Sequence, residues 1–317
     1  DYCDQLSDCI WRQYDSRPSV CGSRSSITAE DRRKERADRM IRPKRKGWNQ
    51  RLFLLCWSGL FVAVLIGITV AGVVWGEEAL ATDFSRKNLA PCWAYPFGTD
   101  WMGRDMFIRT VTGLSLSIRL GLFTAAVSAG IGTIMGMAAV TGKWADGVTG
   151  CIIDMVMGIP HMLLLILISV AVGKGFWGVA VGISLTHWTS LARLLRAEAL
   201  QMKESPYVAT ARKLGKGWIY IAGKHMIPHL LPQLLAGMVL LFPHGILHEA
   251  GITFLGFGLS PEQPAIGVIL SESIGHLMMG RWWLALFPGA LLATVVMMFH
   301  VIGNTLASVL DPKQAQV

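Results

Sequence analysis

Charged residues are scarce in this sequence and unevenly distributed. Only 16% of its 317 residues are Asp, Glu, Lys or Arg, and 52% are hydrophobic, whereas soluble domains carry about 25% charged residues. Residues 1–51 hold 13 of the 29 Lys and Arg and 8 of the 21 Asp and Glu. This distribution excludes a disordered chain, and it excludes a nucleic-acid-binding protein whose net charge of +8 covers a folded surface. It indicates a charged N-terminal segment followed by a membrane-embedded region.

Several chemical signatures are also missing. The sequence contains no Gly-x4-Gly-Lys-[Ser/Thr] phosphate-binding loop, so we expect that this chain does not hydrolyse ATP and is not itself an enzyme. It shows no period-two alternation typical of a membrane β-barrel. The six cysteines suggest no disulfide framework, and the spacings of Cys3, Cys9 and Cys21 fit no standard zinc site.

Long apolar segments dominate the remainder of the chain. A helix needs about 20 mostly apolar residues to cross the hydrocarbon core of a bilayer. Six segments qualify: Leu52–Trp75, Leu120–Gly142, Met155–Gly173, Gly175–Ala192, Met226–His248 and Trp282–Leu310. We therefore predict an all-α membrane protein with six transmembrane helices.

The distribution of positive charge predicts the orientation of these spans. If the N-terminus is cytoplasmic, 22 of the 29 Lys and Arg lie on the cytoplasmic side and seven lie outside. Positive residues are enriched in cytoplasmic loops. We expect a multi-pass protein of the cell membrane with both termini in the cytoplasm.

The segment between the fourth and fifth spans is the most informative one. Ser205-Pro206 is a helix-start signal, and Gly215 is a stop signal, so residues 207–214 are predicted to form a short helix. A second amphipathic piece, residues 218–226, leads to Pro228 at the membrane. A short helix parallel to the membrane suits contact with another protein, although periodicity alone also allows a solvated loop.

Specific motifs in this segment resemble a known family. The run Tyr207-Val-Ala-Thr-Ala-(x3)-Gly215-(x9)-His225-Met-Ile-Pro228 resembles the coupling loop, or EAA motif, of ABC importer permeases, in its peptide and nickel uptake branch. The stretches 97–117 (with Gly-Thr-Asp-x-x-Gly-Arg-Asp), 254–264 (with Phe-Leu-Gly-Phe-Gly) and 288–312 are similar to other motifs of that branch. One departure is Gly303-Asn304, where the family commonly has Gly-Asp. The resemblance covers residues 45–313, and nickel-type permeases are the most similar subgroup.

The resemblance implies a fold, partners and cofactors. It implies a type I ABC importer permease fold, with a cytoplasmic coupling helix between spans 4 and 5. The implied partners are a second permease subunit in a heterodimer, two cytoplasmic ATPase subunits that bind ATP and Mg, and an extracytoplasmic solute-binding protein; lipid surrounds the spans, and no nucleic acid is involved. The residues implied to contact the ATPase are Tyr207, Ala209, Ala211, Gly215, His225 and Pro228.

Ionisable residues at membrane depth are candidates for the translocation pathway. The candidates are His187, His244, His248 and Glu249, and His244 and His248 lie at i and i+4 on one helix face, as a pair of metal ligands would. The alternative is that these histidines form hydrogen bonds with neighbouring helices. His161 follows Pro160, where we expect it to satisfy a helix kink, and Asp154 is expected to pair with Arg193 or Arg196.

The expected function is that of a pore-forming permease subunit importing nickel or a small metal chelate. A di- or oligopeptide importer is the alternative, and a stand-alone channel or carrier and an intramembrane enzyme fit less well. We expect four regions: residues 1–47, a disordered cytoplasmic extension; 48–112, the first transmembrane helix plus an extracytoplasmic loop; 113–311, the ABC permease domain; and 312–317, a cytoplasmic tail.

Overall fold

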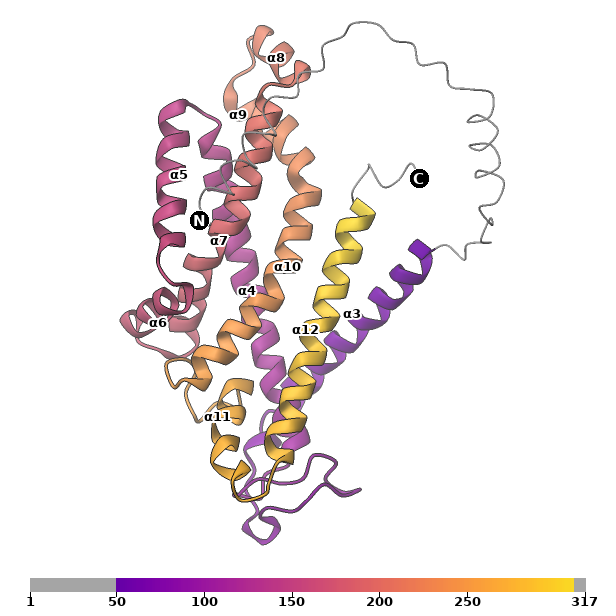
Figure 1. Ribbon diagram of the computed structural model, residues 1–317. Coiled ribbons are helices and arrows are strands. Elements are labelled where there is room, and N and C mark those ends of the chain that lie inside the picture. Colours follow the sequence, from indigo (N-terminus) through magenta and orange to yellow (C-terminus); the bar gives the residue numbers. More distant parts are fainter. Residues whose placement is uncertain (1–49, 311–317) are drawn as a thin grey trace, which may run out of the picture. The chain divides into compact units, whose positions relative to one another are not determined.

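A computed structural model of the protein describes residues 50–310, and every regular element in this range is a helix. The predictions for the N-terminal extension, for Cys3, Cys9 and Cys21, for Asp311-Pro312 and for the tail lie outside the described residues. The main helices are α3 (Gln50–Val74), α4 (Met106–Ala139), α5 (Lys143–Gly158), α6 (His161–Val172), α7 (Gly175–Lys203), α8 (Pro206–Lys213), α9 (Trp218–Ile221), α10 (Ile227–Phe254), α11 (Ile266–Leu277) and α12 (Trp283–Leu310) (Figure 1). The all-helical prediction is confirmed for this part of the chain.

Four of these helices, α3, α4, the continuous stretch from α9 to α10, and α12, are long and apolar enough to cross a membrane. The pair α5 and α6 adds a fifth span if it is taken together. The 29 residues of α7 are sufficient in length, but its second half carries Arg193, Arg196, Glu198 and Lys203. The structure thus supports a multi-pass membrane protein with four or five apolar spans, and the sixth span stays a prediction.

The third predicted span is not a continuous helix, so the expectation that Met155–Gly173 forms a single helix is wrong. The chain bends by 93° between α5 and α6. The reason is local: Pro160 disfavours helical geometry at the residue before it, and Ile159 is extended with φ −87° and ψ 136°. The break leaves His161 as the first residue of α6.

Small residues allow α4 and α7 to pack closely. Gly132 and Gly136 are four residues apart on α4, and a Cβ atom at Gly132 would lie 3.2 Å from the backbone of Trp188 and Ala192 on α7. Such spacing of small residues is how helices approach each other within membranes. Because α4 also contacts α3 and α10, it is the central helix of the described region.

Two buried apolar clusters hold the helices together, one toward each end of the described region. One joins α4, α7 and α10 to the short helices α8 and α9; the other joins α3, α4, α10, α11 and α12. Figure 1 shows α8 and α9 at one end of α7 and α10, and α11 beside the start of α4 at the opposite end. The predicted coupling segment, residues 205–228, and the Gly-Thr-Asp-x-x-Gly-Arg-Asp motif before α4 therefore lie at opposite ends of the helices.

Candidate functional site

The short helix α8 follows α7 as the sequence predicts, and its two faces differ. Pro206 occupies the first turn, and Val208 and Ala211 are buried in the cluster shared with α7 and α10. Tyr207 and Ala209 are exposed on the other face. Ala211 thus packs against this chain's own core, where its small side chain lets α8 approach α7 and α10. Tyr207 and Ala209 are the α8 residues of the predicted contact set that a partner can reach.

Gly215 ends α8 in a left-handed conformation with φ +74°. Its N–H donates to the carbonyl of Arg212 (2.9 Å), and the N–H of Lys216 donates to the carbonyl of Ala211 (3.1 Å). These are the bonds of a glycine-terminated helix end. A Cβ atom at Gly215 would meet nothing within 4 Å, so within this chain the constraint is conformational rather than steric.

His225 lies among aromatic rings at the start of the fifth span. Its ring centroid is 6.4 Å from that of Tyr207 and 6.0 Å from that of Tyr220. The surrounding residues, Ala222–Met226, form a π-helical turn immediately before Pro228. Proline cannot donate the backbone hydrogen bond of a regular turn, and a π turn accommodates such an interruption. His225 and Tyr207 therefore connect the end of this turn to α8.

A cavity of about 650 Å³ lies between the α5–α6 break, α7 and α10. This volume is within the range of small-molecule binding sites. Its wall includes four histidines, His161, His187, His244 and His248, together with Thr186, Thr189 and Ser190. Three of the predicted pathway residues therefore line one cavity, and His161, which the sequence suggested only as part of a kink, joins them.

Glu249, the fourth pathway candidate, is placed differently. It is fully buried between α10 and α4, and its carboxylate accepts hydrogen bonds from the hydroxyls of Ser117 and Thr253. It is absent from the residues that line the histidine cavity. A buried carboxylate needs hydrogen-bond partners, and Glu249 finds them in the interface between α10 and α4.

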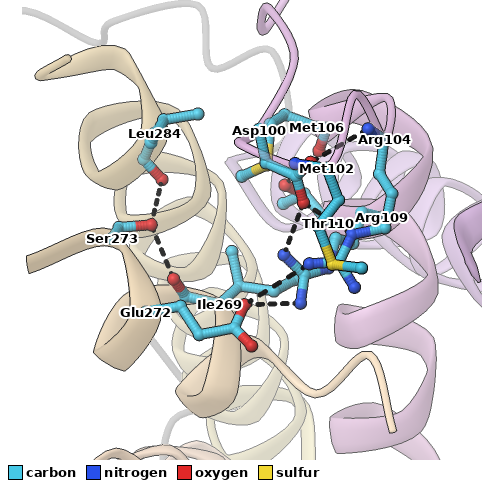
Figure 2. Close-up of polar contacts among 10 residues, drawn as sticks. All are labelled: Asp100, Met102, Arg104, Met106, Arg109, Thr110, Ile269, Glu272, Ser273 and Leu284. Carbon is cyan, nitrogen blue, oxygen red and sulfur yellow. Dashed lines mark hydrogen bonds and ion pairs between the residues drawn. The ribbon is translucent and has the colours of Figure 1, made fainter. Parts of the chain in front are cut away.

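An ionic network lies at the opposite end of the helices (Figure 2). Asp100 accepts from Arg104 Nε (2.6 Å) and from Arg109 Nη1 (3.1 Å), and Arg109 Nη2 donates to Glu272 of α11 (2.6 Å). Asp100 and Arg109 are 0% and 1% exposed. The network joins the loop before α4 to the first turns of α4 and to α11. Ser273 extends the connection, since its hydroxyl lies 2.6 Å from the carbonyl of Ile269 and 2.9 Å from that of Leu284.

The structure shows what four residues of the Gly-Thr-Asp-x-x-Gly-Arg-Asp motif do. Asp100 and Arg104 pair within it, and Gly103 has φ +75° at a point where a Cβ atom would collide with the carbonyl of Asp83. Asp105 caps α4, with its side chain accepting from the N–H of Phe107 at 2.8 Å. Burial raises the pKa of the Asp105 carboxyl above its usual value. These residues fix the conformation of the loop that leads into α4.

Two further ion pairs hold α5 to α7. Arg193 donates to Asp154 at 2.8 Å, which confirms one of the two pairings expected for Asp154. Arg196 pairs with Asp146 at 2.6 Å. Both pairs lie in the half of α7 that leads to α8, and they connect this half to α5.

The sequence did not indicate every residue of these sites. Glu272 is 163 residues from Arg109, and no local pattern marks it as a partner. His161 could have been identified from the sequence. Ile159-Pro160 predicts a helix break, so His161 need not point where a continuous helix would place it.

The chain matches the family described as binding-protein-dependent transport system inner membrane component over residues 128–316, more than half of its length. The chain belongs to this family. Similar relatives include a putative peptide permease protein of Brucella suis biovar 1, 32% identical over 233 residues (73% of this chain, 77% of the relative). A second is the dipeptide transport system permease protein DppC of Bacillus subtilis, 29% identical over 262 residues and 82% of each chain. A third, a putative peptide transport system permease protein also of Brucella suis biovar 1, is 32% identical over 254 residues (80% and 86%).

These findings confirm the resemblance drawn from the motifs. The chain is an ABC importer permease of the peptide and nickel family, a transport component of the membrane and not a catalytic subunit. The named relatives are peptide or dipeptide permeases, so the nickel preference expected from the histidines gains no support from them.

Proposed function

We propose that this chain forms half of the translocation pore of an ATP-driven importer for di- or oligopeptides. The peptide assignment rests on the relatives, which are named as peptide and dipeptide permeases and match most of this chain. A cavity of about 650 Å³ is consistent with a small solute of this kind. The other half of the pore comes from a second permease subunit, and an extracytoplasmic binding protein delivers the solute.

The packing of α8 is the observation that carries the mechanism. Val208 and Ala211 of α8 share one buried cluster with Leu195 of α7 and Leu230 of α10, and α7 and α10 are two walls of the cavity. Interdigitated cores transmit displacement rather than absorb it. Movement of α8 therefore moves the cavity walls, which is what a coupling helix requires.

In this proposal the exposed face of α8 binds a cytoplasmic ATPase. Tyr207 is 45% exposed and the neighbouring Leu214 is 72% exposed, so both offer apolar surface to a partner. Two ATPase subunits bind ATP and Mg, and their closure pushes α8 and α9 as one unit. The N- and C-termini lie on the same cytoplasmic side.

Nickel or a small metal chelate is the second candidate solute. The observation that favours it is the presence of four histidines in the wall of the cavity, since imidazole is a good ligand for nickel. His244 and His248 both belong to that wall, and their role as a pair of metal ligands stays a prediction.

Uptake by the whole transporter separates these candidates. The gene is deleted in its own host, complemented with the wild-type chain or with none, and uptake of a radiolabelled dipeptide and of radioactive nickel is measured in parallel. The proposal predicts that dipeptide uptake depends on this chain. Loss of nickel uptake with normal dipeptide uptake would contradict the peptide assignment and support the second candidate.

A further inference from the structure

Three imidazole rings from three separate helices meet in the cavity. His161 begins α6, His187 lies in the middle of α7, and His248 lies in the second half of α10. Their ring centroids are 4.7 Å apart for His161 and His187, 4.6 Å for His161 and His248, and 5.1 Å for His187 and His248. One potential ligand nitrogen from each ring lies within 4.8 Å of the other two.

The hydrogen bonds of the rings leave nitrogens free for a ligand. His187 Nδ1 lies 3.1 Å from the carbonyl oxygen of Ile183 and 3.2 Å from the hydroxyl oxygen of Thr186. Because the carbonyl only accepts, it favours the tautomer with the proton on Nδ1, which leaves the lone pair on Nε2. Metal-binding histidines typically have this arrangement, with the second ring nitrogen donating to a backbone carbonyl. His248 Nδ1 lies 3.0 Å from the sulfur of Met162, so its other nitrogen is free as well.

A second observation, independent of the distances between the rings, concerns His161. Its Nε2 is buried and has no hydrogen-bond partner among the described residues. A buried polar atom without a partner is costly, and a bound cation would satisfy it. The ring is held beside the other two because Pro160 breaks the helix immediately before it.

We infer that His161, His187 and His248 form a binding site for one divalent transition-metal cation. Three neutral imidazoles suit Zn²⁺, Ni²⁺, Co²⁺ or Cu²⁺, whereas Mg²⁺ and Ca²⁺ require oxygen ligands. Metal–nitrogen bonds of about 2.0–2.1 Å place three tetrahedral ligands about 3.3 Å apart. From a separation of at most 4.8 Å, each ring needs to move inward by about 1 Å to reach this geometry.

The site leaves a coordination position toward the cavity. The residues that line the cavity in the described chain include no Asp, Glu, Lys or Arg, so the protein supplies no negative charge to the ion. We expect the open position to take water or an anionic donor, such as a carboxylate of a solute in the cavity. His244, one turn before His248 and also in the cavity wall, is close enough in sequence to contact such a donor.

The experiment measures metal binding without transport, so its outcome is independent of the proposed function. The full chain, purified with its partner subunits in nanodiscs and without a histidine tag, is titrated with Ni²⁺ and with Co²⁺. The expected result is one high-affinity equivalent per chain with visible Co²⁺ absorption bands of a nitrogen-ligated site. A millimolar excess of Mg²⁺ should not displace it.

Three variants and one control locate the site. His161→Gln, His187→Gln and His248→Gln should each weaken Ni²⁺ binding by more than about tenfold, since losing even an outer partner of a metal ligand costs 10–100-fold. His300→Gln changes an exposed histidine of α12 and should bind Ni²⁺ as the wild type does. Unchanged binding in all three variants, or an equal loss in the control, would overturn the proposal.

A measurement on the unmodified chain covers the case in which a variant fails to assemble. Diethyl pyrocarbonate modifies accessible histidines, and mass spectrometry reports each site. Ni²⁺ should protect His161, His187 and His248 and leave the reactivity of His229, which is exposed at the start of α10, unchanged. Absence of selective protection would contradict the site even if every variant were unstable.

Discussion

At the scale of single residues, backbone conformation matters as much as side-chain chemistry. Gly215 is part of the family motif, and the structure shows why a glycine is suited to it: φ is +74° while the space around it is open. A non-glycine residue in this conformation costs about 1–3 kcal/mol, and asparagine tolerates it best. Two possible reasons for a glycine at position 215 can therefore be tested separately: its positive φ, and the close approach of a partner subunit.

Replacing Gly215 by valine and by asparagine tests this separation. Gly215→Val should abolish solute uptake because a β-branched residue disfavours φ +74°. If conformation is the main requirement, Gly215→Asn should retain a substantial fraction of uptake. Uptake by membrane vesicles is measured at matched permease levels. Equal loss in both variants would show that the partner contact tolerates no side chain, and normal uptake in Gly215→Val would contradict the role of this turn.

A second prediction at this scale concerns Arg109. Arg109→Ala removes one of the two guanidinium groups that pair with Asp100 and Glu272 and leaves only Arg104, which lies 2.6 Å from Asp100 and 3.8 Å from Glu272; removing one partner of a buried ion pair costs about 3–5 kcal/mol. The unfolding midpoint of the purified complex should fall clearly. Arg86→Ala removes an exposed ion pair with Asp83 and should leave it nearly unchanged. A similar midpoint for both variants would show that the buried network contributes little.

At the scale of elements, α8 is a short helix whose orientation depends on two buried side chains. Isolated helices of eight residues are unstable in water, so the position of α8 comes from its packing against α7 and α10. Val208 is 0% exposed in the shared core, whereas Thr210, two residues later, is exposed. The two positions form a matched pair on one helix.

Introducing aspartate at each position tests how α8 is held. Val208→Asp buries a charge without a partner and should release α8, which increases protease cleavage between residues 206 and 228 in the isolated chain. Thr210→Asp places the same charge in solvent and should leave the cleavage rate close to that of the wild type. Cleavage is followed by mass spectrometry of limited digests. Equal protection in the two variants would contradict the anchoring of α8.

At the scale of the whole molecule, we expect α8 and the ionic network around Arg109 to lie on opposite sides of the membrane. The α8 segment contains Arg212 and Lys213. The ionic network of Asp100, Arg109 and Glu272 lies at the opposite end of the helices, where α4 begins beside α11. The excess of Lys and Arg predicts that α8 lies inside the cell. This topology is required for any contact between α8 and an ATPase.

Cysteine labelling in intact cells tests the topology. In a chain whose six natural cysteines are replaced by serine, Arg86→Cys should react with a membrane-impermeant maleimide, and Lys213→Cys should react only after the cells are opened. Both positions are exposed, so accessibility reports sidedness. Labelling of Lys213→Cys from outside would place α8 on the wrong side and would refute the coupling mechanism.

The sequence alone contains the membrane character, most span positions and the α8–Gly215 turn, because apolar length, positive charge and Pro or Gly punctuation act locally along the chain. The family, too, was identifiable from its motifs. Tertiary packing determined the remaining features: Arg109 meets Glu272 across 163 residues, Ala211 faces inward, and three histidines from three helices converge on one cavity. Such contacts depend on the bend between α5 and α6 and on how α7 packs against α10, and no local sequence pattern encodes a distance between separate helices.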